Sequence, residues 1–177
     1  MHMADDDIAD RLTWVEARLE LLELESRYSH LWDSGDASGW AALFCNDGVF
    51  ERADGGEPSG EMARGRAALA QRCADAHARQ ASLHFLHLPD LRVEDGRATG
   101  WMNFQFLAIS LVGGEVSETM GFHEVTYLKD PDGWLIEHRT ERCLYRRVHG
   151  SYASQFYAAV LSQRQSEATD PGARPAL

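Results

Sequence analysis

The chain has 177 residues, 44% of them hydrophobic, which is enough for one domain with a substantial core but not for two. Its formal net charge of −11 argues against binding to nucleic acid or to an anionic membrane, because both require basic patches. The N-terminus has no apolar signal region, and no run of about 18 apolar residues occurs. We therefore expect a soluble, cytoplasmic protein.

The first predicted element is a helix over residues 8–33, preceded by a flexible tail at 1–7. Its apolar residues recur at helical spacing and form two neighbouring rows. One row comprises Leu12, Val15, Leu19 and Leu22, and the other comprises Leu21, Leu24, Tyr28 and Leu31. The Ser-Gly-Asp at 34–36 ends the helix, and Asp36 can cap a short second one.

Strand-like segments dominate the second half of the chain. Before them we expect a strand at 47–53, a Gly-rich loop at 54–65 and a third helix at 64–80. Four strands are then predicted, at 82–94, 97–112, 115–128 and 134–146. The breaks between them contain glycines, which supply the positive φ of tight turns, so the four strands form a meander of hairpins. A last helix is expected at 151–165, followed by a flexible tail at 166–177.

Helices that precede strands indicate an α+β domain over 8–165, with the helices packed on one face of a curved, mainly antiparallel sheet. The strand at 97–112 carries apolar residues on both faces, whereas a sheet with one wet face should alternate more cleanly. We therefore expect a second copy of the protein to cover the outer face, in a homo-oligomer such as a dimer or trimer.

Two histidines stand in the apolar stretch SLHFLHLPDL at 82–91. Neighbouring residues of a strand point to opposite faces, so His84 and His87 cannot both enter one cavity. One of them is a site candidate, and the other is interpreted as structural. This spacing, and the absence of a helical His-Glu-x-x-His motif, count against a metal site.

No cofactor is expected from the motifs. The sequence contains no dinucleotide or phosphate-binding Gly-rich motif and no Gly-x-Ser-x-Gly elbow. The three cysteines, Cys45, Cys73 and Cys143, are far apart and odd in number, which does not suit a disulfide framework. We interpret them as structural.

Asp33 is in an unusual place for a carboxylate. At the last turn of the predicted helix it meets the negative end of the helix dipole, which costs roughly 0.3–1 kcal/mol. Either Asp33 is a solvated turn residue, or it is tolerated because it pairs with an imidazole. Tyr28, on the apolar row, is either a core tyrosine or part of the same site.

Several polar residues share a strand face with residues that alternation assigns to the core. These are Asn103 with Trp101, His123 with Tyr127, and Arg142 with Ile136. A buried polar group must be paired or must face a cavity, so together they predict a polar-lined pocket within the sheet.

Residues 22–51 resemble the opening of the SnoaL-like group in the nuclear transport factor 2-like superfamily. The shared pattern is a helix that ends in Arg-Tyr and then Asp, a Gly-Asp turn, and a Leu-Phe and an Asp-Gly that lead into the first strand. The resemblance covers about residues 10–147. It implies a cone-shaped α+β barrel, in which a bent sheet wraps round the helices and a pocket lies between them.

Within this superfamily the chain is similar to bile-acid 7α-dehydratase, scytalone dehydratase and hexachlorocyclohexane dehydrochlorinase. Tyr28 and Asp33 match a Tyr and an Asp of the bile-acid enzyme, and the stretch HFLHLP resembles its His-x-x-His followed by Pro. The other two enzymes have an Asp at Asp33 and a His before an aromatic residue at His84. The resemblance implies that Asp33 and His84 form a catalytic dyad for elimination, with Tyr28 beside them and an active-site arginine near Arg142.

These patterns favour a cofactor-independent, dehydratase-type lyase acting on a small apolar, cyclic, polyketide-like or steroid-like substrate. The substrate contacts we expect are Trp32, Trp101, Asn103, His123 and Arg142. The alternatives are a non-catalytic ligand-binding or subunit protein on the same fold, and an isomerase that uses the same pocket. The match to ketosteroid isomerases is poorer, because Arg52 stands at the position of their catalytic base.

Overall fold

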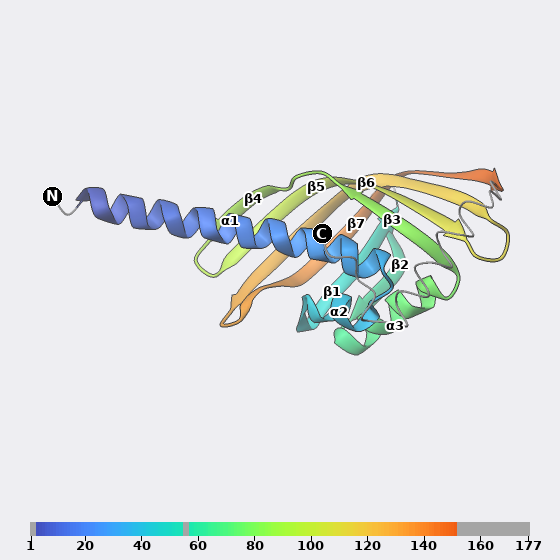
Figure 1. Ribbon diagram of the computed structural model, residues 1–177, viewed down its shortest axis with the longest axis horizontal. Helices are drawn as coiled ribbons and strands as arrows, with labels where there is room; N and C mark the ends of the chain where they lie inside the picture. The colour runs from blue at the N-terminus through green and yellow to red at the C-terminus, as the bar shows by residue number, and fades with distance from the viewer. Residues whose placement is uncertain (1–2, 55–56, 152–177) are drawn as a thin grey trace, which may run out of the picture.

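The computed structural model describes residues 3–54 and 57–151 of the chain (Figure 1). Its helices are α1 (Met3–Asp33), α2 (Ala37–Ala42) and α3 (Arg66–His77). Its strands are β1 (Phe44–Asp54), β2 (Glu57–Arg64), β3 (Gln80–Leu86), β4 (Asp90–Glu94), β5 (Arg97–Ser110), β6 (Glu115–Asp130) and β7 (Gly133–Ser151). None of the helices in the described part of the chain is long and apolar enough to cross a membrane.

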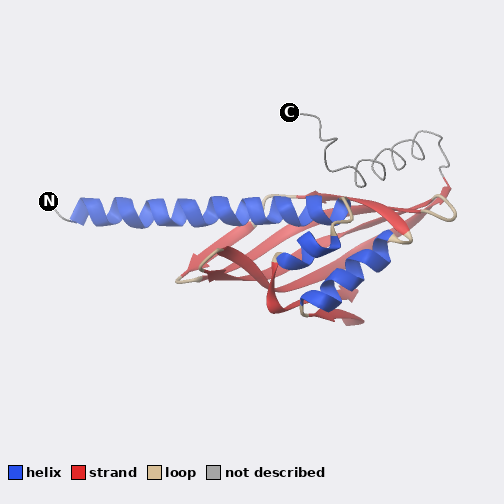
Figure 2. Cartoon of the chain, turned by 60° about the horizontal axis from the view of Figure 1, so that its bottom comes forward, coloured by secondary structure: helices blue, strands red, loops and turns tan. Residues whose placement is uncertain are grey.

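The strands form one curved sheet in the order β2-β1-β7-β6-β5-β3, and β4 pairs with the outer part of β5. All pairings are antiparallel except that of β1 with β7, which is parallel. The sheet bends around α1, and α2 and α3 lie near the C-terminal end of that helix (Figures 1 and 2). The sheet does not close, because β2 and β3 remain as its two edges. The α+β, cone-like fold expected from the sequence is therefore confirmed.

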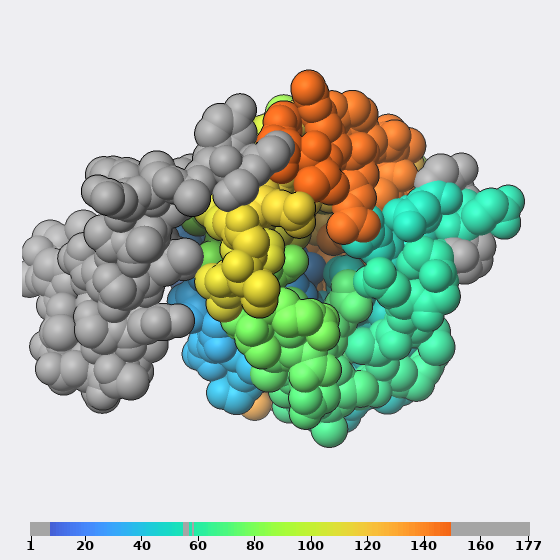
Figure 3. All heavy atoms as spheres, turned by 90° about the vertical axis from the view of Figure 1, so that its right-hand side faces the viewer, coloured from blue at the N-terminus to red at the C-terminus, as the bar shows by residue number. Residues whose placement is uncertain are grey.

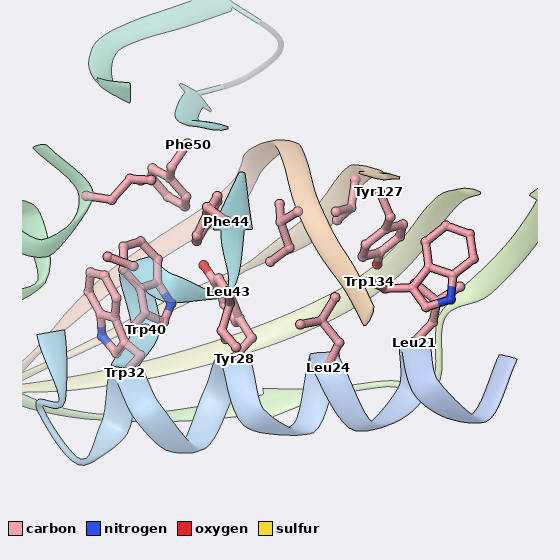
Figure 4. Packing of buried hydrophobic residues seen from close by; sticks show 14 of the residues in the cluster. Leu21, Leu24, Tyr28, Trp32, Trp40, Leu43, Phe44, Phe50, Tyr127 and Trp134 are labelled. Atoms are coloured by element: carbon pink, nitrogen blue, oxygen red, sulfur yellow. The ribbon is translucent and has the colours of Figure 1, made fainter. Parts of the chain in front are cut away.

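The core lies between α1 and the concave face of the sheet. Four residues at helical spacing, Leu21, Leu24, Tyr28 and Trp32, point from one side of α1 into it (Figure 4). They meet aromatic residues of α2, β1 and β6, including Trp40, Phe44 and Tyr127. This packing fixes the end of α1 against the sheet, which is where the candidate site lies.

Some element boundaries differ from the sequence-based prediction. Residues 57–64 form strand β2 where a Gly-rich loop was expected, and they pair with β1 at the edge of the sheet. A strand of loop-like composition is tolerated there, because an edge strand has pairing demands on one side only. The expected strand at 82–94 is divided into β3 and β4 around Pro89, and α1 begins at Met3, within the predicted tail. The helix expected at 151–165 lies almost entirely outside the described residues.

The pairing of β7 with β6 contains three bulges, and two of them determine which β7 side chains face the core near the site. Ile136 and His138 pair with the adjacent residues Tyr127 and Thr126, so Glu137 is an extra residue. Beyond this bulge, inward positions fall on odd-numbered residues. The second bulge lies near Leu144, opposite Gly121, where an added Cβ would come within 1.8 Å of the Arg142 carbonyl oxygen. Only glycine fits at that position, and beyond this bulge the inward positions return to even-numbered residues.

Candidate active site

Asp33 is placed by the way α1 ends. Gly35 adopts a positive φ of 75°, and its N–H donates to the carbonyl of Trp32. The N–H of Asp36 donates to the carbonyl of Leu31, which completes the Schellman arrangement that terminates many helices. The helix therefore stops one turn past Tyr28, and the Asp33 side chain is presented to strand β3.

Both oxygens of Asp33 are bound by His84, which follows 51 residues later in the chain. The His84 backbone N–H donates to Oδ2 at 2.8 Å, and the ring Nδ1 lies 2.8 Å from Oδ1. A carboxylate can only accept, so this contact favours the neutral tautomer that carries its proton on Nδ1. Nε2 is left with a free lone pair, and the His84 side chain lines a cavity.

Aromatic rings enclose the His84 imidazole. The ring centroids of Tyr28 and Trp32 lie 6.0 Å from that of His84, in edge-on arrangements, and Phe106 is centred 4.6 Å away. The indole N–H of Trp32 donates to the Ser82 hydroxyl at 3.1 Å, which fixes the indole. Only 4% of the His84 side chain is exposed, so the Asp33 carboxylate takes the place of water as the hydrogen-bond partner of Nδ1.

The cavity has a volume of about 590 Å³, which suits a small organic molecule. It opens between the end of β7, drawn in orange, strand β2 in teal, and the green residues that end α3 and begin β3 (Figure 3). Its apolar wall includes Tyr28, Trp32, Phe50, Phe106 and Ala108. Its polar wall includes Arg52, Arg72, Arg79, Ser117, Thr119, Glu141 and Arg146.

Tyr28 is almost completely buried, yet it lines the same cavity as His84. Burial raises the pKa of its hydroxyl well above the usual value, although the nearby Arg139 charge opposes the shift. The Arg139 guanidinium carbon lies 3.7 Å from the centre of the Tyr28 ring, in cation–π contact. Tyr28 is thus held rigidly and keeps its proton at any physiological pH.

A buried polar network lies behind Tyr28. Arg139 forms an ion pair with Glu25, its Nη1 lies 2.6 Å from His123 Nδ1, and the Tyr127 hydroxyl donates to Glu25 at 2.8 Å. Burial, assisted by the Arg139 charge, lowers the pKa of His123 to about 4, so this imidazole is neutral at pH 7. The network orients Tyr28 from behind.

Glu141 connects this network to the cavity. Its carboxylate lies 3.7 Å from His123 Nε2 and 3.8 Å from Arg52 Nε, and it lines the cavity wall. Burial acts to raise its pKa, but the polar contact with His123 and the charge of Arg52 lower the pKa to about 2. Glu141 is therefore ionised at neutral pH, and it lines the cavity together with the carboxylates of Glu61 and Asp75.

The structure brings together four of the residues singled out in the sequence. Tyr28, Trp32 and His84 line the cavity, and Asp33 holds His84. His123 is completely buried behind the cavity wall and packs on Phe104, with ring centroids 4.5 Å apart. His123 therefore contacts Arg139 and Glu141 but does not line the cavity.

Three expected substrate contacts lie elsewhere. Arg142 is turned to the outer face by the bulge at Glu137 and pairs there with Glu124. Asn103 and Trp101 are exposed on the convex face of β5, because Met102 and Phe104 take the inward positions. The expected placement of these two residues in the pocket is wrong. Both faces of β5 carry apolar residues, so alternation alone could not identify the face that packs inward.

Sequence reasoning missed Glu141, Arg139 and Arg146. Arg139 and Glu141 follow the bulge at Glu137, and the lost alternation hid their inward positions. Arg146 follows the second bulge, where the inward positions are even-numbered again, so alternation does place it inward. One signal was present, because Glu25 stands among the apolar residues of α1 and a buried carboxylate requires a cationic partner. Among the described residues, no group of three or more His, Cys, Asp or Glu is arranged to hold a metal ion.

Comparison with known proteins places this geometry in a family. A search of curated protein sequences finds no match to the chain. Among solved structures, the chain is similar to an NTF2-like protein with a cystatin-like fold from Novosphingobium aromaticivorans. The two are 28% identical, the match covers 88% of this chain and 96% of that one, and the TM-score is 0.62.

Two other similar structures from N. aromaticivorans show the fold alone. A candidate scytalone dehydratase is 16% identical, with 81% of this chain and 96% of that one covered and a TM-score of 0.67. A candidate aromatic ring hydroxylase is 19% identical, with coverage of 77% and 94% and a TM-score of 0.68. The family model of the SnoaL-like domain matches residues 14–140, a span that contains Tyr28, Asp33 and His84. The chain therefore belongs to the SnoaL-like domain family.

Proposed function

We propose that the protein is a cofactor-independent lyase that catalyses a dehydratase-type elimination, with the Asp33–His84 dyad as its general base. One observation carries the proposal: Asp33 binds both the backbone N–H and the ring of His84, and the His84 side chain faces the cavity. A carboxylate at a helix end and a nearly buried imidazole are both costly, and together they form an oriented base.

In this mechanism His84 Nε2 removes a proton from a carbon beside a carbonyl group of the substrate. The electrons of the C–H bond enter an enolate, and the imidazolium that forms is stabilised by the Asp33 carboxylate. The Tyr28 hydroxyl, which its raised pKa keeps protonated, donates a hydrogen bond to the enolate oxygen.

The second step breaks the bond between carbon and oxygen. The enolate collapses to a carbon–carbon double bond conjugated with the carbonyl, and the departing hydroxyl takes the proton from His84 and leaves as water. The imidazole returns to its neutral form, so no other reactant is needed. General base catalysis of this kind contributes about 10²–10⁴ in rate.

The cavity walls indicate the class of substrate. The aromatic rings of Tyr28, Trp32 and Phe106 around His84 favour an apolar, cyclic body next to the base. The more exposed arginines, Arg79 and Arg146, favour polar substituents at the far end. A cyclic β-hydroxy ketone or ester with a polar side group meets both requirements.

A screen of cyclic β-hydroxy carbonyl compounds tests the proposal. Elimination creates a conjugated carbonyl, which absorbs in the near ultraviolet, so turnover can be followed directly. We expect at least one compound to be converted by the wild-type chain and conversion to fall at least 100-fold in His84→Gln. Equal conversion by the two chains would remove His84 from the mechanism.

The second candidate is a non-catalytic ligand-binding or subunit role on the same fold. It is supported by the fold shared with the beta subunit of a candidate aromatic-ring-hydroxylating dioxygenase from N. aromaticivorans. The two functions separate in one assay, because a ligand-binding protein retains the added compound unchanged, whereas a lyase releases the conjugated product. An isomerase would instead return a product of unchanged mass.

A further inference from the structure

Helix α1 has two apolar faces, and only one of them is covered. Ala17, Leu21, Leu24 and Tyr28 pack on the sheet and form the inner face. The outer stripe consists of Ile8, Leu12, Val15 and Leu19, whose exposed fractions are 60%, 56%, 43% and 60%. At 100° per residue these two sets lie about half a turn apart. The outer stripe therefore faces away from the body of the protein.

The spacing of the outer stripe is that of a coiled coil. Its residues are separated by four, three and four positions, and Leu22, which is partly buried, extends the series by three. An alternation of three and four residues is the heptad seam, with Leu12 and Leu19 at position a and Ile8, Val15 and Leu22 at position d. Single exposed apolar residues are common, but a continuous seam of this kind is a pairing surface.

The charges beside the stripe specify its partner. Arg11 and Arg18 occupy the g positions along one edge, and Glu16 and Glu23 occupy the e positions along the other. In a parallel pair of identical helices, each g residue faces the e residue of the following heptad in the other helix. Arg11 of each helix then faces Glu16 of the other helix, and Arg18 of each helix faces Glu23 of the other. An antiparallel pair would oppose arginine to arginine and glutamate to glutamate.

We propose that a second copy of the chain docks on the outer stripe, in a short parallel coiled coil formed by the two α1 helices. The geometry permits it, because the N-terminal part of α1 projects past the end of the sheet (Figures 1 and 2). Because the outer stripe lies about half a turn from the inner face, the pairing would place the two bodies on opposite sides of the helix pair. The seam spans about two heptads, so pairing depends on protein concentration. This surface is separate from the cavity, and the proposal is independent of the proposed function.

Disulfide trapping tests the pairing and its direction. In a parallel pair each a position meets itself, so Leu12→Cys places two thiols face to face. We expect Leu12→Cys to form a disulfide-linked dimer under mild oxidation. Thr13→Cys, at position b and about 100° round the helix from Leu12, should stay at least ten times less cross-linked. The native cysteines are buried and do not interfere. Equal cross-linking of the two variants, or none in either, overturns the proposal.

A charge variant provides the second test. In Leu12→Lys/Leu19→Lys like charges meet across the seam, so sedimentation equilibrium should show association weakened at least tenfold. The melting temperature should stay within a few degrees, because both leucines are exposed in a single copy. Arg11→Glu/Arg18→Glu should weaken the pair as well, and adding Glu16→Arg/Glu23→Arg should restore it. The proposal is wrong if the Lys variant sediments like wild type. It is also wrong if the full chain is a monomer and associates only after residues 152–177 are removed, because the chain's own C-terminal segment would then be what covers the stripe.

Discussion

At the scale of single residues, the site depends on a carboxylate placed where a helix disfavours it. Asp33 lies at the negative end of α1, and its cost is offset because both of its oxygens accept hydrogen bonds from His84. The pairing also positions the base, since it holds the proton on Nδ1 and leaves Nε2 toward the cavity. The same contacts thus serve both stability and chemistry.

The substitution Asp33→Asn separates these two contributions. The amide keeps the size of the carboxylate but cannot stabilise the imidazolium, and it favours the other His84 tautomer. We expect turnover to fall by about 10²–10⁴ while the melting temperature changes by a few degrees. The tautomer can be read from the ¹⁵N shifts of His84. A variant with wild-type turnover would show that Asp33 has no catalytic part.

His123 makes the stability of the protein sensitive to mild acid. Its pKa in the folded chain, about 4, is lower than the ordinary 6.5, because burial disfavours the charged ring. The unfolded chain therefore binds more protons between these values, and stability is full above about pH 6.5 and falls as the pH drops toward 4, by up to about 3 kcal/mol. Urea unfolding at several pH values measures this slope. His123→Gln should lose most of it, and an unchanged slope would assign the acid sensitivity to other groups.

At the scale of elements, the irregularities of β7 determine which side chains reach the cavity. Strict alternation predicts that Arg142 points inward, whereas the bulge at Glu137 brings Arg139 and Glu141 inward instead. A bulge depends on how two distant strands match in length and twist, so the local sequence of β7 does not predict it. The hairpins and helix ends were predictable because glycines and capping residues act locally, as at Gly35 and Asp36.

The difference between local signals and long-range packing also explains which site residues could be predicted from the sequence. Asp33 and His84 were accessible because each conflicts with its local environment and because residues 22–51 resemble a known family. Trp101 and Asn103 were misplaced, since β5 is apolar on both faces and the choice between faces is made by packing on α1. The strand character of β2 was hidden, because its pairing with β1 overrides a loop-like composition.

Gly121 should be essential to the second bulge. A Cβ at this position would lie 1.8 Å from the Arg142 carbonyl oxygen, so backbone has to move. We expect Gly121→Ala to destabilise the fold by at least about 1–3 kcal/mol, as overpacked sites do. Gly113→Ala is the matched control, because its nearest contact is a flexible side-chain atom at 3.8 Å. Equal melting temperatures for the two variants would contradict this role.

At the scale of the whole molecule, the convex face of the sheet carries apolar residues in solvent. Leu83, Phe85, Trp101 and Met120 are all exposed on strands β3, β5 and β6. A patch of this kind on neighbouring strands is typical of an interaction surface, and it supports the homo-oligomer expected from the sequence. We propose that a second copy covers it.

Sedimentation tests this surface independently of α1 when the Leu12→Lys/Leu19→Lys chain, in which α1 cannot pair, is the background. Phe85→Asp/Trp101→Asp should lower the oligomer mass at micromolar concentration without lowering the melting temperature, because both side chains are exposed in one copy. The substitutions lie outside the cavity, so they should leave ligand binding intact. A wild-type chain that sediments as a monomer would contradict the assignment of this face.

The proposed base can be tested apart from the leaving group by hydrogen exchange. Proton NMR in D₂O follows both exchange at the carbon beside the carbonyl and formation of the conjugated product, for a cyclic β-hydroxy ketone that the cavity accepts. The wild-type chain should catalyse exchange and elimination, and His84→Gln should slow both at least 100-fold while still binding the compound. Exchange at the wild-type rate in His84→Gln would contradict the assignment of His84, held by Asp33, as the catalytic base.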